Sequence, residues 1–552
     1  MNLEKYLQQA GKNYNPEICM PGAVWSGPGY HSRIPDGTWV HSTRESIDYA
    51  VLLLESGSRE NRDRAFKIIA AINGLQDRNP YRQTFGIWPW LYEESLEQMA
   101  PPDWNWADFI GAPLAHILKF HRQEMPEELA GQTAVALTNA AWSIFRRNVP
   151  PNYTNIAIMG AAVTSAAGEL LAIPLLREYG RERLKRFLEY TREQGGLNEY
   201  NSPTYTFVAL YEAERILQLV EEPLTRQYAE ELRGVIWESL ARHFHPSTGQ
   251  LAGPHSRAYQ DRLGKAVIAY LQENTGIKIC SNSSDGDDAG APDYVRHLPC
   301  PEHLCSRFAA LPAEEIFFRE KFVSKQPESK SFYGAVWMVD DCCLGSSSYE
   351  CFWTQRRPVL AYWKTGDNIA VMRLRFLKDG KDFSSAGLFN AQDHNRLLTG
   401  IKMFTDRGDF HIHLDRPPDN IFKASSMLLC YELRGSNAVA EQIDAARFAL
   451  RAGGRQAIIH TISGDFNGIP VVWRAVNEPG YARVEAVCHE GEQKDFNINA
   501  DFEVKLCAGL ELLKCGENTS NTVPVLNIGG QNAEAKWSGL KLDYSVKSEK
   551  YD

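Results

Sequence analysis

Hydrophobic positions recur at helical spacing through the first half of the chain. Ile47, Val51 and Leu54 follow the capping-box pattern of residues 42–45, which is typical of a helix start. Similar patterns predict further helices over residues 60–73, 106–123, 128–147, 155–178, 180–193, 203–220, 223–243 and 257–274. Because the intervening loops are short, as in antiparallel helical hairpins, we expect an N-terminal α/α toroid, closed or partly open.

The hydrophobic period changes to two in the second half. Apolar residues alternate with other residues at positions 370–376, 410–414 and 502–506, as in strands that bury one face. A helical pattern of comparable quality interrupts this region only near 440–449. The fold class we predict is therefore multidomain, with the α/α toroid of helical hairpins followed by a C-terminal antiparallel β-sandwich.

These patterns set the expected domain organisation. Residues 1–278 are predicted to form the toroid, which would be the catalytic domain, and residues 331–552 the β-sandwich. Residues 279–330 are expected to serve as a linker or loop region, because the run from 281 to 290 is polar and rich in Ser, Asp and Gly.

Composition narrows the possible partners. The 552 residues are 43% hydrophobic and 23% charged, as in globular proteins, and the net charge of −10 argues against a nucleic-acid partner. An anionic substrate needs only a local basic pocket and stays compatible with that charge. Because neither a signal-like nor a membrane-spanning stretch is visible and the eleven cysteines are scattered, we expect a cytoplasmic protein without a membrane partner.

A turn that opens into a helix collects polar side chains with chemical potential. Glu199, Tyr200 and Asn201 precede Ser202, a predicted N-cap, and Tyr205 follows in the first turn. An acid, phenols and an amide at one helix start can transfer protons and bind a sugar. The competing interpretation is a capped helix with core tyrosines.

A long loop over residues 81–111 is rich in tryptophan and aspartate, and long loops in compact domains are often functional. Flat rings for stacking and carboxylates for hydroxyl groups are typical of a carbohydrate cleft. The alternative is a structural plug over the helices. The substrate-binding candidates here are Trp88, Trp90, Asp103, Trp104 and Trp106.

Two further helix starts carry candidates. Asn152 and Asn155 open a helix rich in small residues, where an amide can donate to a carboxylate or simply cap the helix. His255, Arg257 and Tyr259 lie in a turn before another predicted helix. They supply a base, a bidentate carboxylate anchor and a phenol.

The C-terminal half adds one candidate stretch and no cofactor. It contains Trp353, Gln355, Arg356 and Arg357, which are expected either to complete an anion site or to form a strand end that packs between domains. Cys300, His303 and Cys305 are closely spaced but lack a second ligand pair, so we expect no metal site.

Taken in order, these motifs resemble the toroid polysaccharide lyases, including chondroitin AC lyases, hyaluronate lyases and the heparinase II/III group. The resemblance is carried by an Asn at a helix start, Pro203 and Tyr205 at a later one, an Arg-containing turn, and a β-domain. It implies that Asn155, or Asn152, neutralises a uronate carboxylate. It further implies Tyr205 as acid or base and Arg257 as an anchor.

The chain departs from the lyase pattern at one position. The family places a His a few residues before the Pro-Tyr motif, where this chain has Tyr200. Under the resemblance, His255 or Tyr200 would have to act as the base.

Three functions therefore stay open. The first is a lyase that cleaves an anionic, uronate-containing oligosaccharide or polysaccharide by β-elimination. The second is a glucuronidase-like glycoside hydrolase, which needs two carboxylates, with Glu199 paired to Asp103 or Asp108. The third is a non-catalytic glycan-binding protein. The oligomeric state does not follow from the sequence.

Overall fold

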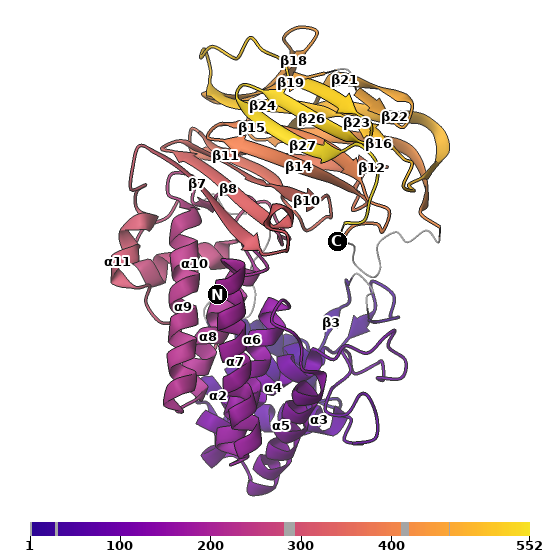
Figure 1. The fold of residues 1–552 in the computed structure, drawn as a ribbon. Coiled ribbons are helices and arrows are strands. Elements are labelled where there is room, and N and C mark those ends of the chain that lie inside the picture. The colour runs from indigo at the N-terminus through magenta and orange to yellow at the C-terminus, as the bar shows by residue number, and fades with distance from the viewer. Residues whose placement is uncertain (1–2, 28–30, 281–292, 410–418, 463, 552) are drawn as a thin grey trace. The chain divides into compact units, whose positions relative to one another are not determined.

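The computed structural model describes residues 3–27, 31–280, 293–409, 419–462 and 464–551. Its chain forms two compact units, each assembled from non-contiguous stretches (Figure 1). The helical unit comprises Met1–Arg192, Phe207–Trp237 and Asp287–Leu298. The β unit comprises Glu193–Thr206, Glu238–Gly286 and Pro299–Asp552.

Helices occupy most of the first 275 residues, as predicted. They are α1 (Leu3–Lys12), α2 (Thr43–Glu55), α3 (Arg59–Leu75), α4 (Trp106–Phe120), α5 (Glu127–Arg147), α6 (Thr154–Leu170), α7 (Pro174–Gln194), α8 (Tyr205–Leu219), α9 (Pro223–His243) and α10 (Lys265–Thr275), with a short α11 (Glu302–Cys305) beyond them. The predicted cap of α2 is confirmed, since Ser42 Oγ accepts a hydrogen bond from the Glu45 backbone N–H. In the described ranges no helix has both the length and the apolarity to cross a bilayer.

The helical unit is built from packed hairpins. Helix α2 packs against α3 and α4, α4 packs against α5 and α6, and α5 also contacts α3 and α6. Helices α4 and α6 are buried on nearly all sides, whereas α3, α5 and α7 are amphipathic. The predicted succession of helical hairpins is therefore confirmed, with α4 and α6 on the inside.

Small residues let these helices approach closely. A Cβ added at Gly180 in α7 would lie 2.6 Å from the Ser165 nitrogen in α6 and closer still to the Ser165 hydroxyl oxygen. A Cβ at Gly111 in α4 would lie 2.8 Å from Val163 Cγ1. The small side chains near 160–167 thus serve helix packing.

The β unit consists of antiparallel sheets. One sheet runs in the order β10 (Tyr349–Cys351), β14 (Ala386–Asp393), β15 (Arg396–Met403), β24 (Cys507–Lys514), β19 (Arg455–Thr461), β18 (Arg447–Ala452), β17 (Val439–Gln442). The larger sheet runs in the order β23 (Val504–Lys505), β20 (Gly464–Phe466), β21 (Ile469–Glu478), β22 (Tyr481–Asn497), β16 (Ile421–Arg434), β12 (Asn368–Lys378), β11 (Val359–Thr365), β9 (Cys342–Ser347), β8 (Phe332–Val339), β7 (Glu315–Val323), with β13 (Lys381–Asp382) beside β12.

The two large sheets share one core. Trp363 and Phe376 from the larger sheet pack in the same cluster as Leu388 and Ile459 from the smaller one. A third layer, β25 (Val525–Gly529), β26 (Asn532–Trp537) and β27 (Leu540–Ser545), packs against β14 and β15. The predicted antiparallel β-sandwich is confirmed, with this extra layer added.

Short two-residue strands complete the described chain. They pair as β1 (Tyr14–Asn15) with β2 (Met20–Pro21), β3 (Ala23–Val24) with β4 (Trp39–Val40), and β5 (Phe244–His245) with β6 (Gln250–Leu251).

Several predicted elements differ from the structure. The helix expected over 155–178 ends at Leu170, and α7 begins at Pro174, because proline disfavours helical geometry in the residue before it. The helix expected over 257–274 begins only at Lys265. The pattern near 440–449 forms strands β17 and β18, and regular strands start at Glu315 rather than 331. The patterns at 281–290 and 410–414 lie outside the described residues.

Gly180→Ala tests the close packing of α6 and α7. The added methyl group overlaps Ser165, so we expect a loss of about 1–3 kcal/mol despite the better helix propensity of alanine. The matched control is Gly131→Ala in α5, where nothing lies within 4 Å of the added Cβ and stability should rise slightly. Denaturant unfolding measures both, and equal stability of the two variants would contradict the packing.

Candidate functional site

The turn between α7 and α8 is joined to the segment after β6 by hydrogen bonds. Asn201, in a left-handed conformation with φ of 48°, donates through Nδ2 to the carbonyl oxygens of Ala252 at 2.6 Å and Pro254 at 3.0 Å. The Ser256 backbone N–H donates to the Tyr200 carbonyl oxygen at 3.1 Å. Because Asn201 is buried, its amide satisfies two carbonyl groups that water does not reach.

The start of α8 uses the same segment. Ser202 Oγ accepts a hydrogen bond from the Tyr205 backbone N–H at 2.8 Å, which confirms the predicted N-cap. The same hydroxyl donates to the Arg257 carbonyl oxygen at 2.6 Å. One serine thus fixes the first turn of α8 against the backbone that carries Arg257.

A third segment, between β10 and β11, completes the arrangement. The backbones of His255 and Arg357 exchange hydrogen bonds at 3.2 and 2.9 Å, and the Ala258 N–H donates to the Gln355 carbonyl oxygen at 2.8 Å. These strand-like contacts take up backbone groups that a helix would need, which explains why α10 starts late.

Tyr205 and Tyr259 form a hydrogen-bonded pair of phenols, with Oη atoms 2.5 Å apart. Arg257 Nη2 donates to Tyr205 Oη at 3.0 Å, and its guanidinium lies 4.7 Å from the centre of the Tyr205 ring. Gln355 Oε1 accepts from Arg257 Nε at 2.9 Å, and Glu199 Oε1 lies 3.4 Å from Arg257 Nη1. Of the predicted catalytic residues, the structure therefore brings Tyr205, Arg257 and Glu199 together, with Tyr259 beside them.

The environment keeps Tyr205 protonated. Burial raises the pKa of the Tyr205 phenol well above its usual value, and the nearby charge of Arg257 only partly opposes this shift. Tyr259 is 56% exposed, so the pair has a solvent-facing end. Tyr205 can therefore act as a shielded proton donor, and Tyr259 connects it to solvent.

Tyr200 belongs to a different, enclosed network. Its hydroxyl donates to Glu320 Oε1 at 2.8 Å and lies 2.9 Å from His243 Nε2, while its ring stacks on Phe322. The phenol is 3% exposed, and burial followed by the charge of Glu320 raises its pKa well above the usual value. Tyr200 is thus packed as a core residue.

His255 is also enclosed. Its side chain is buried, and burial together with the charge of Arg357 lowers the pKa of His255 to about 3. Its Nδ1 has no hydrogen-bond partner. The imidazole is therefore neutral at ordinary pH and shielded from solvent.

Arg356 is engaged within the β unit. It donates to the Ser256 carbonyl oxygen at 2.5 Å, pairs with Asp409, and lies 3.6 Å from Glu350. Its neighbour Arg357 instead lines a large pocket. The sequence suggested both arginines for an anion site, and of the two it is Arg357 that lines this pocket.

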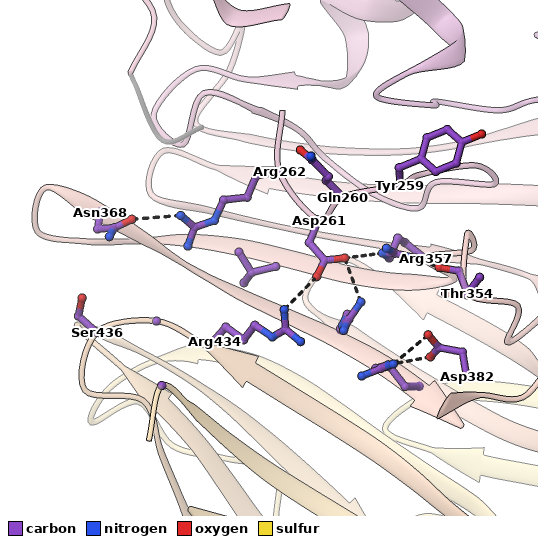
Figure 2. Close-up of a pocket in the computed structure, with 15 residues that line it drawn as sticks. Tyr259, Gln260, Asp261, Arg262, Thr354, Arg357, Asn368, Asp382, Arg434 and Ser436 are labelled. Atoms are coloured by element: carbon purple, nitrogen blue, oxygen red, sulfur yellow. Dashed lines mark hydrogen bonds and ion pairs between the residues drawn. The ribbon is translucent and has the colours of Figure 1, made fainter. Parts of the chain in front are cut away.

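That pocket has a volume of about 820 Å³ and adjoins the phenol pair through Tyr259 (Figure 2). Its walls come from residues 259–262, from Thr354 and Arg357, and from strands β12, β13 and β16, with turn residues 435, 436 and 480. Two aspartates, Asp261 and Asp382, face five arginines, which are Arg262, Arg357, Arg373, Arg375 and Arg434. The lining is therefore positive on balance in a protein of net charge −10.

Asp261 holds several of these arginines together. It pairs with Arg357, lies 3.1 Å from Arg373 Nη1 and 3.9 Å from Arg434 Nη1 (Figure 2). Burial alone would raise the pKa of Asp261, but Arg357 and then Arg373 outweigh it and hold the pKa below its usual range. Glu432, opposite Arg373 in the strand pairing, contacts Arg373 at 3.1 Å and Arg434 at 2.9 Å.

The other three arginines of the pocket differ in how far their donor groups are engaged. Arg375 binds Asp382 bidentately at 2.7 and 2.8 Å, whereas Arg434 is 49% exposed at its side chain. Arg262 donates to the Ile369 carbonyl oxygen at 3.1 Å. A planar guanidinium that faces solvent is suited to carboxylate or sulfate groups.

Sequence reasoning missed most of this pocket, although one signal was present. Alternation in β12 puts Arg373 and Arg375 on the face opposite the core residues Met372 and Leu374. Strand pairing then brings Arg434 beside them, since it lies opposite Val371. Only pairing between strands about 60 residues apart gathers the arginines.

The tryptophan-rich loop lies in the helical unit. Trp90 stacks on Trp106 with ring centres 4.9 Å apart, and its Nε1 donates to Asp103 at 3.2 Å. Trp104 is partly exposed and donates to the Gln83 carbonyl oxygen. Trp88 is completely buried, so its ring has no face for a sugar. The loop thus contains a buried tryptophan that packs against the helices as well as rings that are partly exposed.

The start of α6 holds the two candidate asparagines. Asn155 is 8% exposed, and its Oδ1 has no hydrogen-bond partner, whereas Asn152 is exposed. In the same unit, burial raises the pKa of Asp108 to about 7, against the charges of Arg183 and Arg147. Asp108 is therefore a carboxyl group that can carry a proton near neutral pH.

Comparison with known proteins gives a family match over part of the chain. Residues 25–271 match a family model described as a domain of unknown function, DUF8769. No curated protein matches the sequence.

Solved structures match over most of the chain at low identity. A crystal structure of heparinase III is 9% identical with a TM-score of 0.46, covering 92% of this chain and 82% of that one. A heparan sulfate lyase from Pedobacter heparinus is 9% identical with a TM-score of 0.36, covering 99% and 94%. These similar structures include heparinase III, in keeping with the resemblance that the sequence indicated, and at these identities the chemistry has to be argued from this chain's own residues.

Asp261→Asn tests the charge balance of the pocket. Removing the carboxylate leaves Arg357 and Arg373 without their shared partner, which costs on the order of 3 kcal/mol for a largely buried pair. Since the folded pKa of Asp261 is lowered, this stabilisation is complete above its ordinary pKa of about 3.9 and is lost as pH falls through the folded value.

The free energies of unfolding of the wild type and Asp261→Asn should therefore differ most near neutral pH and become equal in acid. Asp444→Asn removes a surface partner of Arg447 and is the control, with little effect expected. A pH-independent difference for Asp261→Asn would contradict the assigned charge state.

Proposed function

We propose that the protein is a lyase that cleaves an acidic polysaccharide by β-elimination at a uronate residue. The observation that supports this most is the pair Tyr205–Tyr259, held by Arg257, at the side of the arginine-lined pocket. Phenols for proton transfer and guanidinium groups for an anion thus adjoin each other in the β unit.

The pocket supplies the binding part of the proposal. Acidic sugars carry carboxylate and often sulfate groups, and the half-exposed Arg434 presents its guanidinium group in a cavity that has room for sugar rings. Asp261 and Asp382 compensate part of the charge and can accept hydrogen bonds from sugar hydroxyl groups. The remaining positive charge favours polyanions over neutral glycans.

The phenol pair supplies the proton chemistry. Elimination breaks the C5–H and C4–O bonds and places the electron pair of the C–H bond in a new C4–C5 double bond. In the active form the two phenol oxygens together carry one proton. That proton lies on Tyr205, because burial favours the neutral state of this phenol. Tyr259 takes the proton from C5, while Tyr205 gives its own proton to the leaving oxygen.

Arg257 then stabilises the phenolate left on Tyr205, 3.0 Å from its guanidinium. A proton shift along the 2.5 Å contact from Tyr259 to Tyr205 restores the starting state. Glu199 and Gln355 orient Arg257 from two sides, so they act as positioning residues in this scheme.

Other sequence candidates keep narrower roles in the proposal. Asn155, Trp90 and Trp104 belong to the helical unit and stay predictions from the sequence, which the proposed chemistry of the β unit does not use. Tyr200 and His255 are enclosed and support the turn on which the reactive groups lie.

Tyr205→Phe should abolish elimination while the protein stays folded. Loss of the acid should lower kcat by about 10²–10⁴-fold, measured as ultraviolet absorbance of the unsaturated product on heparan sulfate or a related uronate polymer. Tyr333→Phe removes a hydroxyl that hydrogen-bonds Glu328 in the β unit outside the pocket and should leave kcat unchanged. Full activity of Tyr205→Phe would exclude the mechanism.

Arg434→Gln should weaken substrate binding more than chemistry. Losing one guanidinium at the pocket should raise KM about 10-fold, as for one charge-assisted hydrogen bond, with kcat nearly unchanged. Arg474→Gln is the matched control, because Arg474 is also a partly exposed arginine of the same sheet but pairs with Glu490 outside the pocket. Equal KM values for the two variants would rule out the pocket as the anion site.

The product distinguishes the alternatives. A saturated non-reducing end without new ultraviolet absorbance would identify hydrolysis, for which the sequence suggested Glu199 paired with Asp103 or Asp108. Binding of a polyanion without any product would identify a glycan-binding protein.

A further inference from the structure

Three side chains of the helical unit that the proposed function does not use converge on one point. They are Glu55, the last residue of α2, His116 in the last turns of α4, and His121, which follows α4. Glu55 Oε1 lies 2.9 Å from His116 Nε2 and 3.0 Å from His121 Nε2. These ligand atoms all lie within 4.8 Å of one another.

The packing of two helices produces this convergence. Helix α2 contacts α4, and the two imidazoles are five residues apart at the end of α4. The chain then enters a 3₁₀ turn, η1 (Arg122–Glu124), which places Glu124 Oε1 3.2 Å from His121 Nδ1. A carboxylate thus lies behind His121 on the side away from Glu55.

Each ring nitrogen of His121 faces a carboxylate. If Nδ1 carries the proton that binds Glu124, the Nε2 of a neutral ring has a lone pair and cannot donate to Glu55. The 3.0 Å approach of two acceptors then requires either a second proton or a metal ion between them. A histidine that donates to a carboxylate through one nitrogen and binds metal through the other is a common arrangement.

We propose that Glu55, His116 and His121 bind one divalent transition-metal ion of the zinc class. Two imidazole nitrogens and a carboxylate oxygen form a ligand set typical of Zn²⁺ with one open position. Tetrahedral ligands about 2.0–2.1 Å from zinc are roughly 3.3 Å apart, so the observed 2.9 and 3.0 Å contacts need to open by only a few tenths of an ångström.

Burial of the ligands fits this role. His116 and His121 are 4% and 8% exposed, whereas the Glu55 side chain is 38% exposed. An ion therefore enters from the Glu55 side and keeps water at its remaining position. The ring of His116 is held between Phe120 and Tyr294, with centres 4.7 and 5.1 Å away.

The sequence led us to expect no metal site, and no motif spacing reveals this one. His116 and Glu55 are separated by 61 residues and meet only through helix packing. The proposal is independent of the lyase chemistry, because these residues belong to the helical unit and the phenol pair to the β unit.

The test uses the full chain, stripped with a chelator and titrated with Zn²⁺ by calorimetry. The wild type should bind one ion at this site, and its thermal midpoint should rise with Zn²⁺. Glu55→Gln keeps the size and polarity of the side chain and should abolish both Zn²⁺ binding and the rise of the thermal midpoint. Circular dichroism of the metal-free variant checks that this variant folds. Glu124→Gln should weaken affinity about 10–100-fold without removing a ligand.

His394→Gln is the control, because His394 is a partly exposed histidine paired with Asp393 in the β unit and should leave binding unchanged. The Co²⁺ form separates this site from the exposed thiols of Cys280 and Cys515, since a His–His–Glu site gives no thiolate-to-cobalt absorption. Thiolate bands, no bound ion in the wild type, or equal binding by Glu55→Gln would each overturn the proposal.

Discussion

The candidate site depends on the buried amide of Asn201. Its two N–H groups satisfy the carbonyl oxygens of Ala252 and Pro254, which belong to a segment without regular structure. A buried carbonyl group left without a donor costs about 1–3 kcal/mol, so this side chain stabilises a backbone path that would otherwise be unfavourable. Through that path Arg257 and Tyr259 reach Tyr205.

Charge compensation is the second constraint on the β unit. Arginines on neighbouring strands repel one another unless acids lie among them, and Asp261 and Glu432 take that place. The acids are fewer than the arginines, so the pocket keeps positive charge while the fold stays stable. A protein with a net charge of −10 thus offers an anion a local basic surface.

In the helical unit, close helix packing determines which side chains meet. Small residues bring α4, α6 and α7 into close contact, and the ends of α2 and α4 then place Glu55 and His116 side by side. The two imidazoles are buried where α4 ends, and the Glu55 side chain is partly exposed beside them. The proposed metal site and the proposed lyase chemistry therefore arise in separate units from separate physical causes.

Sequence alone determined the elements whose signals are local. The cap at Ser42, the cap at Ser202 and the alternation in β12 follow from neighbouring residues, so no long-range contact is needed to recognise them. The fold class, helical hairpins followed by antiparallel strands, follows from the same periodicities.

The contacts between distant segments follow only from the tertiary structure. The late start of α10, the strands at 439–452 and the enclosure of His255 result from hydrogen bonds and burial supplied by other parts of the chain. The arginine pocket and the Glu55–His116–His121 cluster likewise exist only where strands or helices pair across some 60 residues. Local periodicity fixes which face a residue occupies, but only long-range packing fixes which residues that face meets.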